Sequence, residues 1–123
     1  RLQLLGYFLA NKIELIEDGK VALAHFTSEE LSRYNVITGD TEGFVNYGLS
    51  IKGVQLSALI IDRDYLVKMS FRSTDVFPCN EFSAEFFNGG GHKNAAGGAS
   101  EDSLENTLTK FKESIKSYRS YLA

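Results

Sequence analysis

The sequence predicts a single α/β domain, built as a mixed sheet of about five strands with helices packed against it. Three observations lead to this prediction. The chain has 123 residues, a size typical of one compact domain. Hydrophobic residues make up 43% of it and charged residues 24%, an ordinary globular composition. Segments that alternate like strands are interleaved with segments of helical spacing, although this order does not fix the order of strands in the sheet.

The chain is expected to begin with the end of a helix, followed by a hairpin. Leu2, Leu5 and Leu9 recur at helical spacing. The segment IELIEDGKVALAHF then has apolar runs on both sides of Asp18-Gly19, a dipeptide typical of tight hairpin turns. We therefore predict two antiparallel strands in this segment.

Two short helices are predicted next. Thr27 and Glu30 form the T-x-x-E pattern of a capping box, which predicts a helix from Ser28 to Tyr34. A second helix is predicted around Glu42 to Tyr47, within the glycine-containing segment TGDTEGFVNYGLSIKG.

Two further strands, VQLSALIID and DYLVKMSFRS, are expected to be joined by a tight connection at residues 62–64. Alternation in the second strand places apolar and polar side chains on opposite faces. The apolar ones are Val67, Met69 and Phe71, and the polar ones are Lys68, Ser70 and Arg72. The guanidinium of Arg72 is a planar fork that suits a phosphate group. An arginine at a strand end also commonly pairs with a surface carboxylate, so both interpretations are kept.

The last third of the chain is expected to contain helix, glycine loop, strand and helix. A helix from Asn80 to Phe87 should bury Phe82 and Phe86 and end at Asn88-Gly89. AAGGAS is expected as a short strand, and Asp102 with Glu105 resembles a cap for the final helix. That helix carries an apolar stripe, which we expect to pack in the core. The stripe consists of Leu104, Leu108, Phe111, Ile115, Tyr118 and Leu122.

Charge and composition limit the classes of partner. The net charge is −3 and the isoelectric point about 5.4, the wrong sign for coating long nucleic acid through many phosphate contacts. Phosphate recognition must therefore be local. No apolar run approaches the length of a membrane span, and the start lacks the features of a signal peptide. With Cys79 as its only cysteine, the protein is expected to be cytoplasmic, without a membrane partner and without a cysteine-based metal site.

The segment FNGGGHKNAAGG is the least ordinary part of the chain. Three consecutive glycines let a ligand approach the main chain without meeting a Cβ atom. Their N–H groups can point into one concavity that favours an anion such as phosphate. His92 can donate to a phosphate oxygen there, and Lys93 and Asn94 add donors. The alternative is that this glycine loop is only a turn after a helix.

Together, SIKGVQLSALIIDRDYLVKMSFRS and FNGGGHKNAAGG resemble the DHH-associated C-terminal domain of DHH-family phosphoesterases. The hallmark of that domain is a strand ending in Ser-hydrophobic-Arg-Ser, followed by a GGGH-Ala-Ala-Gly loop. The resemblance runs through nearly the whole chain. TEGFVNYGLSIKGV further resembles the branch of short-oligoribonucleotide hydrolases that also act as 3'-phosphoadenosine 5'-phosphate phosphatases, some of which are labelled exopolyphosphatase-related.

The resemblance implies a division of labour between two domains. In the family, an N-terminal domain with an Asp-His-His motif binds two divalent metals, usually manganese, which activate water. The C-terminal domain closes over the substrate and binds its phosphates or terminal nucleotide. This sequence has no Asp-His-His motif, and the chain starts at Arg1 rather than methionine. We therefore expect residues 1–10 to be the end of an interdomain linker helix and residues 11–123 to be the substrate-binding domain, with no catalytic residue and no metal ligand in this chain.

The resemblance also assigns the substrate-binding positions. They are Arg72, Ser73, Gly89, Gly90, Gly91, His92 and Asn94. Arg72 is expected to hold substrate phosphate with help from Ser73, and the glycine loop with His92 to face the scissile region; Asn94 is the weaker candidate. Asn88 stands where the family often has a first glycine, but asparagine tolerates left-handed backbone angles, so the turn can survive.

The function implied is the substrate-binding half of an enzyme acting on short oligoribonucleotides and 3'-phosphoadenosine 5'-phosphate, inactive without its N-terminal DHH domain. Its expected partners are that domain and short RNA or nucleotide phosphates, and a homodimer is left open. The same domain of a RecJ-type exonuclease or of a cyclic-dinucleotide phosphodiesterase is an alternative. Two others are a non-catalytic nucleotide-binding module and an interaction domain whose glycine loop packs on a partner chain.

Overall fold

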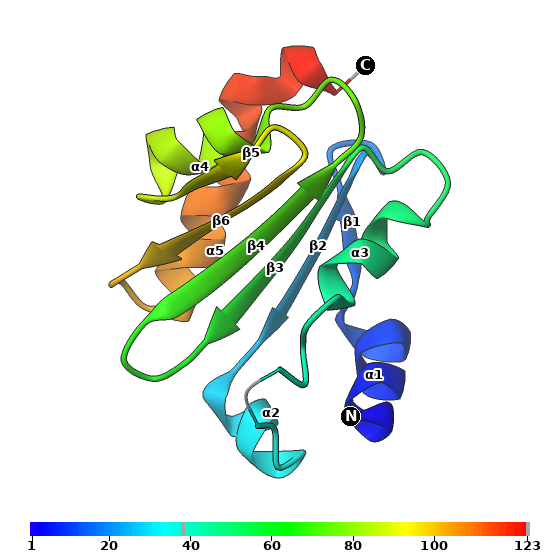
Figure 1. Cartoon of the computed structure of the whole chain (residues 1–123), viewed down its shortest axis with the longest axis vertical. Helices are drawn as coiled ribbons and strands as arrows, with labels where there is room; N and C mark the ends of the chain where they lie inside the picture. Colours follow the sequence, from blue (N-terminus) through cyan, green and yellow to red (C-terminus); the bar gives the residue numbers. More distant parts are fainter. Residues whose placement is uncertain (38, 123) are drawn as a thin grey trace.

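The computed structural model describes residues 1–37 and 39–122. A six-stranded mixed sheet forms its centre, with the strand order β1-β2-β3-β4-β6-β5 (Figure 1). The strands are β1 Glu14–Ile16, β2 Val21–Phe26, β3 Leu56–Asp62, β4 Val67–Ser73, β5 Gly90–His92 and β6 Ala95–Ser100. β2 and β3 are parallel, and every other neighbouring pair is antiparallel. The predicted α/β fold and both predicted hairpins are confirmed.

The sheet has one strand more than the expected five, and that strand lies in the glycine stretch. Residues Gly90–His92 form β5, which pairs with β6 at the edge of the sheet, where we expected a loop. Gly91 permits a close approach of β5 to β6, because a Cβ on it would lie 2.7 Å from the carbonyl oxygen of Ala95.

Helical segments occupy most of the remaining chain. They are α1 Leu2–Tyr7, the π-helical η1 Phe8–Lys12, α2 Ser28–Arg33, α3 Phe44–Leu49, α4 Cys79–Phe86, α5 Leu104–Ser114 and the 3-10 helix η2 Ile115–Tyr121. The capping box of Thr27 and Glu30 is confirmed at the start of α2. The expected cap of α5 is wrong by one residue: the Ser103 hydroxyl accepts from the backbone N–H of Asn106. None of the described helices is long and apolar enough to cross a membrane.

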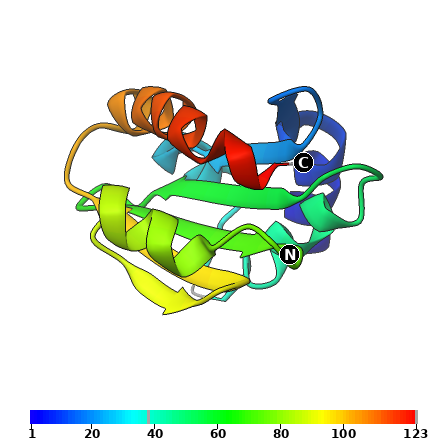
Figure 2. The same cartoon turned by 90° about the horizontal axis from the view of Figure 1, so that it is seen from above.

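One face of the sheet is closed by α4, α5 and η2, and Figure 2 shows the last two lying along it. Phe71 of β4 is at the centre of this core, with the rings of Phe82, Phe87 and Phe111 at 5.5, 6.0 and 6.1 Å. The stripe of the final helix packs into the same cluster, as predicted. Phe87 is fully buried whereas Phe86 is only partly so, because α4 ends at Phe86 and the chain turns inward.

The opposite face is closed mainly over β2 and β3, although α3 also comes close to β4. Phe8 and Phe44 meet Phe26 of β2 there, and Leu4 packs beside them. The buried side of the first helix is thus Leu4 and Phe8, while Leu2, on which the sequence prediction rested, is 83% exposed. α3 lies close to the sheet because it presents Gly48, where a Cβ would be 2.2 Å from the hydroxyl of Ser57.

The buried carboxylate of Glu30 in α2 is hydrogen-bonded to the first helical segments, α1 and η1. Glu30 accepts hydrogen bonds from the hydroxyl of Tyr7, the ammonium of Lys12 and the backbone N–H of Thr27. Burial by itself raises the pKa of Glu30, but these donors outweigh it and lower the pKa to about 2. Glu30 is therefore ionised in the folded protein over the whole neutral range.

Candidate functional site

Arg72 and His92 lie in one row across three strands. Arg72 of β4 and His92 of β5 are both paired with Ala95 of β6, from its two sides. Directly opposed residues on neighbouring strands point to the same face of a sheet. The two predicted phosphate-binding side chains therefore share a face, separated by a methyl group, with their Cα atoms about 10 Å apart.

The next row on this face is made of small residues. Ser70, Gly97 and Gly90 oppose one another across β4, β6 and β5. A Cβ built on Gly90 would meet no atom within 4 Å, so no packing contact explains this glycine. The two rows together form a flat floor on which a ligand can approach the main chain.

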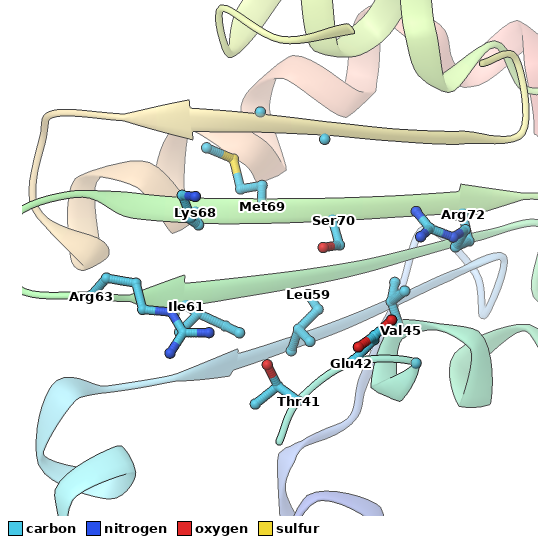
Figure 3. Close-up of a pocket in the computed structure, with 13 residues that line it drawn as sticks. Thr41, Glu42, Val45, Leu59, Ile61, Arg63, Lys68, Met69, Ser70 and Arg72 are labelled. Carbon is cyan, nitrogen blue, oxygen red and sulfur yellow. The ribbon is translucent and has the colours of Figure 1, made fainter. Parts of the chain in front are cut away.

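Beside this floor is a cavity of about 430 Å³, between residues 41–45 and strands β3, β4 and β6 (Figure 3). Arg72 lies at one end of the cavity, Lys68 and Arg63 at the other, and Ser70 between them. Val45, Leu59 and Ile61 form an apolar wall. The remaining lining residues are Thr41, Glu42, Gly43, Met69, Gly97 and Gly98.

The cations of this cavity are not neutralised by ion pairs. The guanidinium of Arg72 donates to the carbonyl oxygen of Phe71 at 2.9 Å. Within residues 1–37 and 39–122, no carboxylate forms an ion pair with Arg72, Arg63 or Lys68. Among the described residues, Arg72 therefore does not take the alternative role of pairing with a surface carboxylate. The described lining of this cavity therefore carries an excess of positive charge on a chain of net negative charge.

The turn that carries His92 is fixed by hydrogen bonds to two other elements. The carbonyl of Lys93 accepts from the backbone N–H of Cys79 at the start of α4, at 2.6 Å. The carbonyl of Asn94 accepts from the N–H of Ser73 at 3.0 Å, and the Asn94 amide donates to the Ser73 hydroxyl at 3.0 Å. His92 is thus held in a defined position relative to the end of β4.

Ser73 and Asn94 are not brought together with Arg72 and His92. Ser73 is buried and follows Arg72 in the strand, so its side chain points to the opposite face. Its hydroxyl donates to the carbonyl of Phe77 at 2.7 Å. In this structure Ser73 and Asn94 fix the turn between β5 and β6. Direct contact of either residue with a ligand stays a prediction.

The glycines before His92 have different surroundings. A Cβ on Gly89 would lie 1.9 Å from the carbonyl oxygen of Gly97, so α4 and β6 pack tightly there. Gly91 has φ 141°, and a Cβ on it would lie 2.7 Å from the carbonyl oxygen of Ala95. Asn88 adopts φ 52°, and the turn does survive its replacement of glycine.

The backbone of this stretch does not form the predicted concavity of N–H groups along β5. In an extended strand, successive N–H groups point in alternating directions, whereas a concavity requires them to converge. This face therefore offers an anion an open surface of small residues, together with side-chain donors and cations.

Sequence reasoning missed Lys68 and Arg63 as site residues. The signal for Lys68 was present, because alternation placed it on the face of Arg72. Arg63 follows β3 in the connection to β4, where no periodic pattern applies. No three His, Cys, Asp or Glu side chains come together as a metal site in the part of the chain that the structure describes. These residues do not fit the divalent metals that the resemblance implies.

The fold is that of a DHH-associated accessory domain. Residues 18–120 match the DHHA1 domain, and the chain belongs to that family. It is similar over 98% of its length to an exopolyphosphatase-related protein from Bacteroides fragilis, with 42% identity and a TM-score of 0.93. The chain spans 35% of the length of that protein.

Two more distant structures share the fold. A pGpG-specific phosphodiesterase, PggH, from Vibrio cholerae is 15% identical over 96% of this chain, with a TM-score of 0.68, and the chain spans 39% of it. The C-Ala domain of Aquifex aeolicus alanyl-tRNA synthetase is 15% identical, with a TM-score of 0.55, and the match covers 90% of this chain and 97% of that domain. A comparison with curated proteins finds no match.

Proposed function

We propose that this chain is the substrate-binding half of a metal-dependent DHH phosphoesterase that hydrolyses short oligoribonucleotides and 3'-phosphoadenosine 5'-phosphate. The observation that carries the proposal is the shared row of Arg72 and His92 on an open face. Membership of the DHHA1 family and the similarity to an exopolyphosphatase-related protein support the phosphoesterase class.

Arg72 and His92 divide the work of holding a phosphate group. The guanidinium fork of Arg72 donates to two phosphate oxygens, and His92 donates from the other side of Ala95. Gly97 and Gly90 leave room for the ester group beside them. Charge-assisted hydrogen bonds of this kind orient the phosphorus atom for attack by a group that another domain holds.

The chemical step is assigned to the N-terminal DHH domain of the same protein, which is this chain's partner in the proposal. Divalent metals, manganese in most of the family, would be bound there and would supply an activated water. This chain would bind and orient the substrate, and by itself hydrolyse nothing when manganese is added. The intact protein would act in the cytoplasm.

The test is an amide-shift NMR titration of this chain with 3'-phosphoadenosine 5'-phosphate, diadenylate and inorganic phosphate. It is repeated on Arg72→Ala and His92→Ala, with Lys52→Ala as a matched control outside the cavity lining. We expect dissociation constants on the order of 0.1 to 1 mM, because half of the site belongs to another domain. Shifts should concentrate near Arg72 and His92 and be larger for nucleotides than for phosphate.

Each outcome decides the proposal. Loss of binding in Arg72→Ala and His92→Ala, but not in Lys52→Ala, supports it. If no resonance moves at several millimolar nucleotide, or if the two substitutions leave affinity unchanged, the phosphate-binding role of this row is wrong. Turnover by the purified chain alone would refute the assignment of chemistry to another domain.

A further inference from the structure

We infer that the far end of the cavity, at Lys68 and Arg63, is a second phosphate subsite, which holds a further phosphate of the oligonucleotide bound at Arg72 and His92. The inference rests on the proposed function of the Arg72 row. It specifies the substrate as a phosphodiester chain that occupies the cavity lengthwise, rather than a mononucleotide that fills one end.

The charge of the cavity favours anions at both of its ends. Its described lining holds three cations, Arg63, Lys68 and Arg72, and one carboxylate, that of Glu42. None of the three cations forms an ion pair among the described residues, although the chain carries more acidic than basic residues. An excess of positive charge in a concave site raises the local concentration of anions.

The spacing of the cations calls for two anionic groups. Lys68 and Arg72 are four residues apart on the same face of β4, so their Cα atoms are separated by about 13 Å. Figure 3 shows Lys68 and Arg63 at one end of the cavity and Arg72 at the other. Charge-assisted hydrogen bonds to phosphate are only about 2.8 Å long, so in this arrangement one phosphate does not serve both ends.

The wall between the two ends favours a nucleotide over a bare phosphate chain. Leu59 and Ile61 of β3 line the cavity beside Ser70 and Lys68 of β4, and Val45 lines it from α3 (Figure 3). Ligand sites that combine an apolar wall with a few placed polar groups suit molecules with both apolar and polar parts. A ribose or base packs against such a wall, whereas inorganic polyphosphate has nothing to place there.

The experiment compares ligand lengths on this chain. Dissociation constants are measured for 3'-phosphoadenosine 5'-phosphate, 5'-phosphorylated triadenylate and tripolyphosphate at several salt concentrations. The proteins are the wild type, Lys68→Ala, Arg63→Ala, Lys68→Arg and the control Lys52→Ala. Lys68 and Lys52 are both exposed, so thermal unfolding should show each variant folded.

We expect triadenylate to bind the wild type about fivefold more tightly than the mononucleotide, since one more charge-assisted contact is made. Lys68→Ala and Arg63→Ala should lose this gain and keep the mononucleotide affinity, and Lys68→Arg should restore it. Loss of one phosphate contact should reduce the slope of log K against log salt concentration for triadenylate by about 0.7.

Three results would overturn the second subsite. They are no gain with length in the wild type, an equal loss for both nucleotides in Lys68→Ala, and a tripolyphosphate affinity equal to that of triadenylate. Failure of the proposed function looks different, because then the mononucleotide itself either does not bind or binds without dependence on Arg72. Binding that depends on Arg72 but not on ligand length would remove the second subsite alone.

Discussion

The face of the sheet that carries the candidate site has two halves with opposite properties. Over β2 and β3 it carries an apolar cluster, in which Phe26 meets the aromatic rings of Phe8 and Phe44, and Leu59 and Ile61 belong to the same cluster. Over β4, β6 and β5 the same face bears small residues together with Lys68, Arg72 and His92. Both halves belong to one continuous sheet and share its backbone geometry.

The difference between the halves agrees with the rule that helices pack on the part of a sheet that offers large apolar side chains. A helix needs a large apolar surface to bury, and the β2–β3 half offers one. The β4–β6–β5 half offers glycine, alanine and serine beside the polar side chains of Lys68, Arg72 and His92, so covering it would gain little hydrophobic free energy. Surface that does not bind a helix stays accessible to a ligand, and the predictions below test this contrast.

The largest difference in stability between two substitutions is expected for Phe71 and Arg72, neighbours in β4 that point to opposite faces of the sheet. Phe71→Ala should lower the free energy of unfolding by about 3 to 5 kcal/mol, because it empties the centre of the aromatic core. Arg72→Ala should change it by less than about 0.5 kcal/mol and abolish nucleotide binding. Urea denaturation with a parallel binding titration measures both. Equal destabilisation by the two substitutions would contradict the contrast.

The glycines before His92 provide a matched pair with a smaller effect. Gly89→Ala places a Cβ against the carbonyl of Gly97 and should cost about 3 kcal/mol. Gly90→Ala has open space around it and should leave stability unchanged within about 0.5 kcal/mol, while it weakens ligand binding. The unfolding midpoint and the nucleotide affinity of both variants check this. A Gly90→Ala protein with full affinity would show that no ligand lies over that residue.

The stability of the half that the helices cover should depend on pH through the ionisation of Glu30. Its pKa of about 2 is below the ordinary value of 4.5, so its stabilising contribution is complete above about pH 4.5 and is lost as pH falls toward 2. Glu30→Gln should lower stability at pH 7 by about 1 to 3 kcal/mol and flatten the acid limb. The exposed Glu29→Gln is the control, and unfolding curves between pH 2 and 7 are the measurement. An unchanged acid limb in Glu30→Gln would disprove the role.

The smallest effect is expected at the turn between β5 and β6. Asn94→Ala removes two hydrogen bonds, which the Asn94 amide donates to the Ser73 hydroxyl and the Thr74 carbonyl. It should lower the free energy of unfolding by about 1 kcal/mol. Affinity for nucleotide should fall two- to threefold, because His92 is less well placed. A loss of affinity as large as that of Arg72→Ala would instead indicate that Asn94 contacts the ligand directly.

Local sequence signals predicted the elements of this fold well. The hairpin at Asp18-Gly19, the capping box at Thr27 and the alternation around Arg72 each depend on neighbours within a few residues. Features that depend on distant partners were not accessible. Gly90 looked like loop sequence because glycine is rare in strands, and only its pairing with Gly97 of β6 makes it one.

The candidate site shows the same division. Alternation predicted that Arg72 lies on the polar face of its strand. It did not predict which strand lies beside that strand. The row of Arg72, Ala95 and His92 exists because β6 enters between β4 and β5, which is a property of the whole sheet. The separate surroundings of Gly89 and Gly90 likewise depend on how α4 packs against β6.

The single parallel pair in the sheet also bears on how fast the protein folds. The β1–β2 and β3–β4 hairpins join residues close in sequence, whereas the β2–β3 seam joins Val21 to Leu56 and needs the intervening chain to close as a loop. Contacts between distant residues slow folding more than local ones do. Pairing along this seam is therefore expected to be slow, as is pairing between β4 and β6, where Val67 meets Ser100. Substitutions in the seam should therefore slow refolding, and those in the β5–β6 edge should mainly speed unfolding.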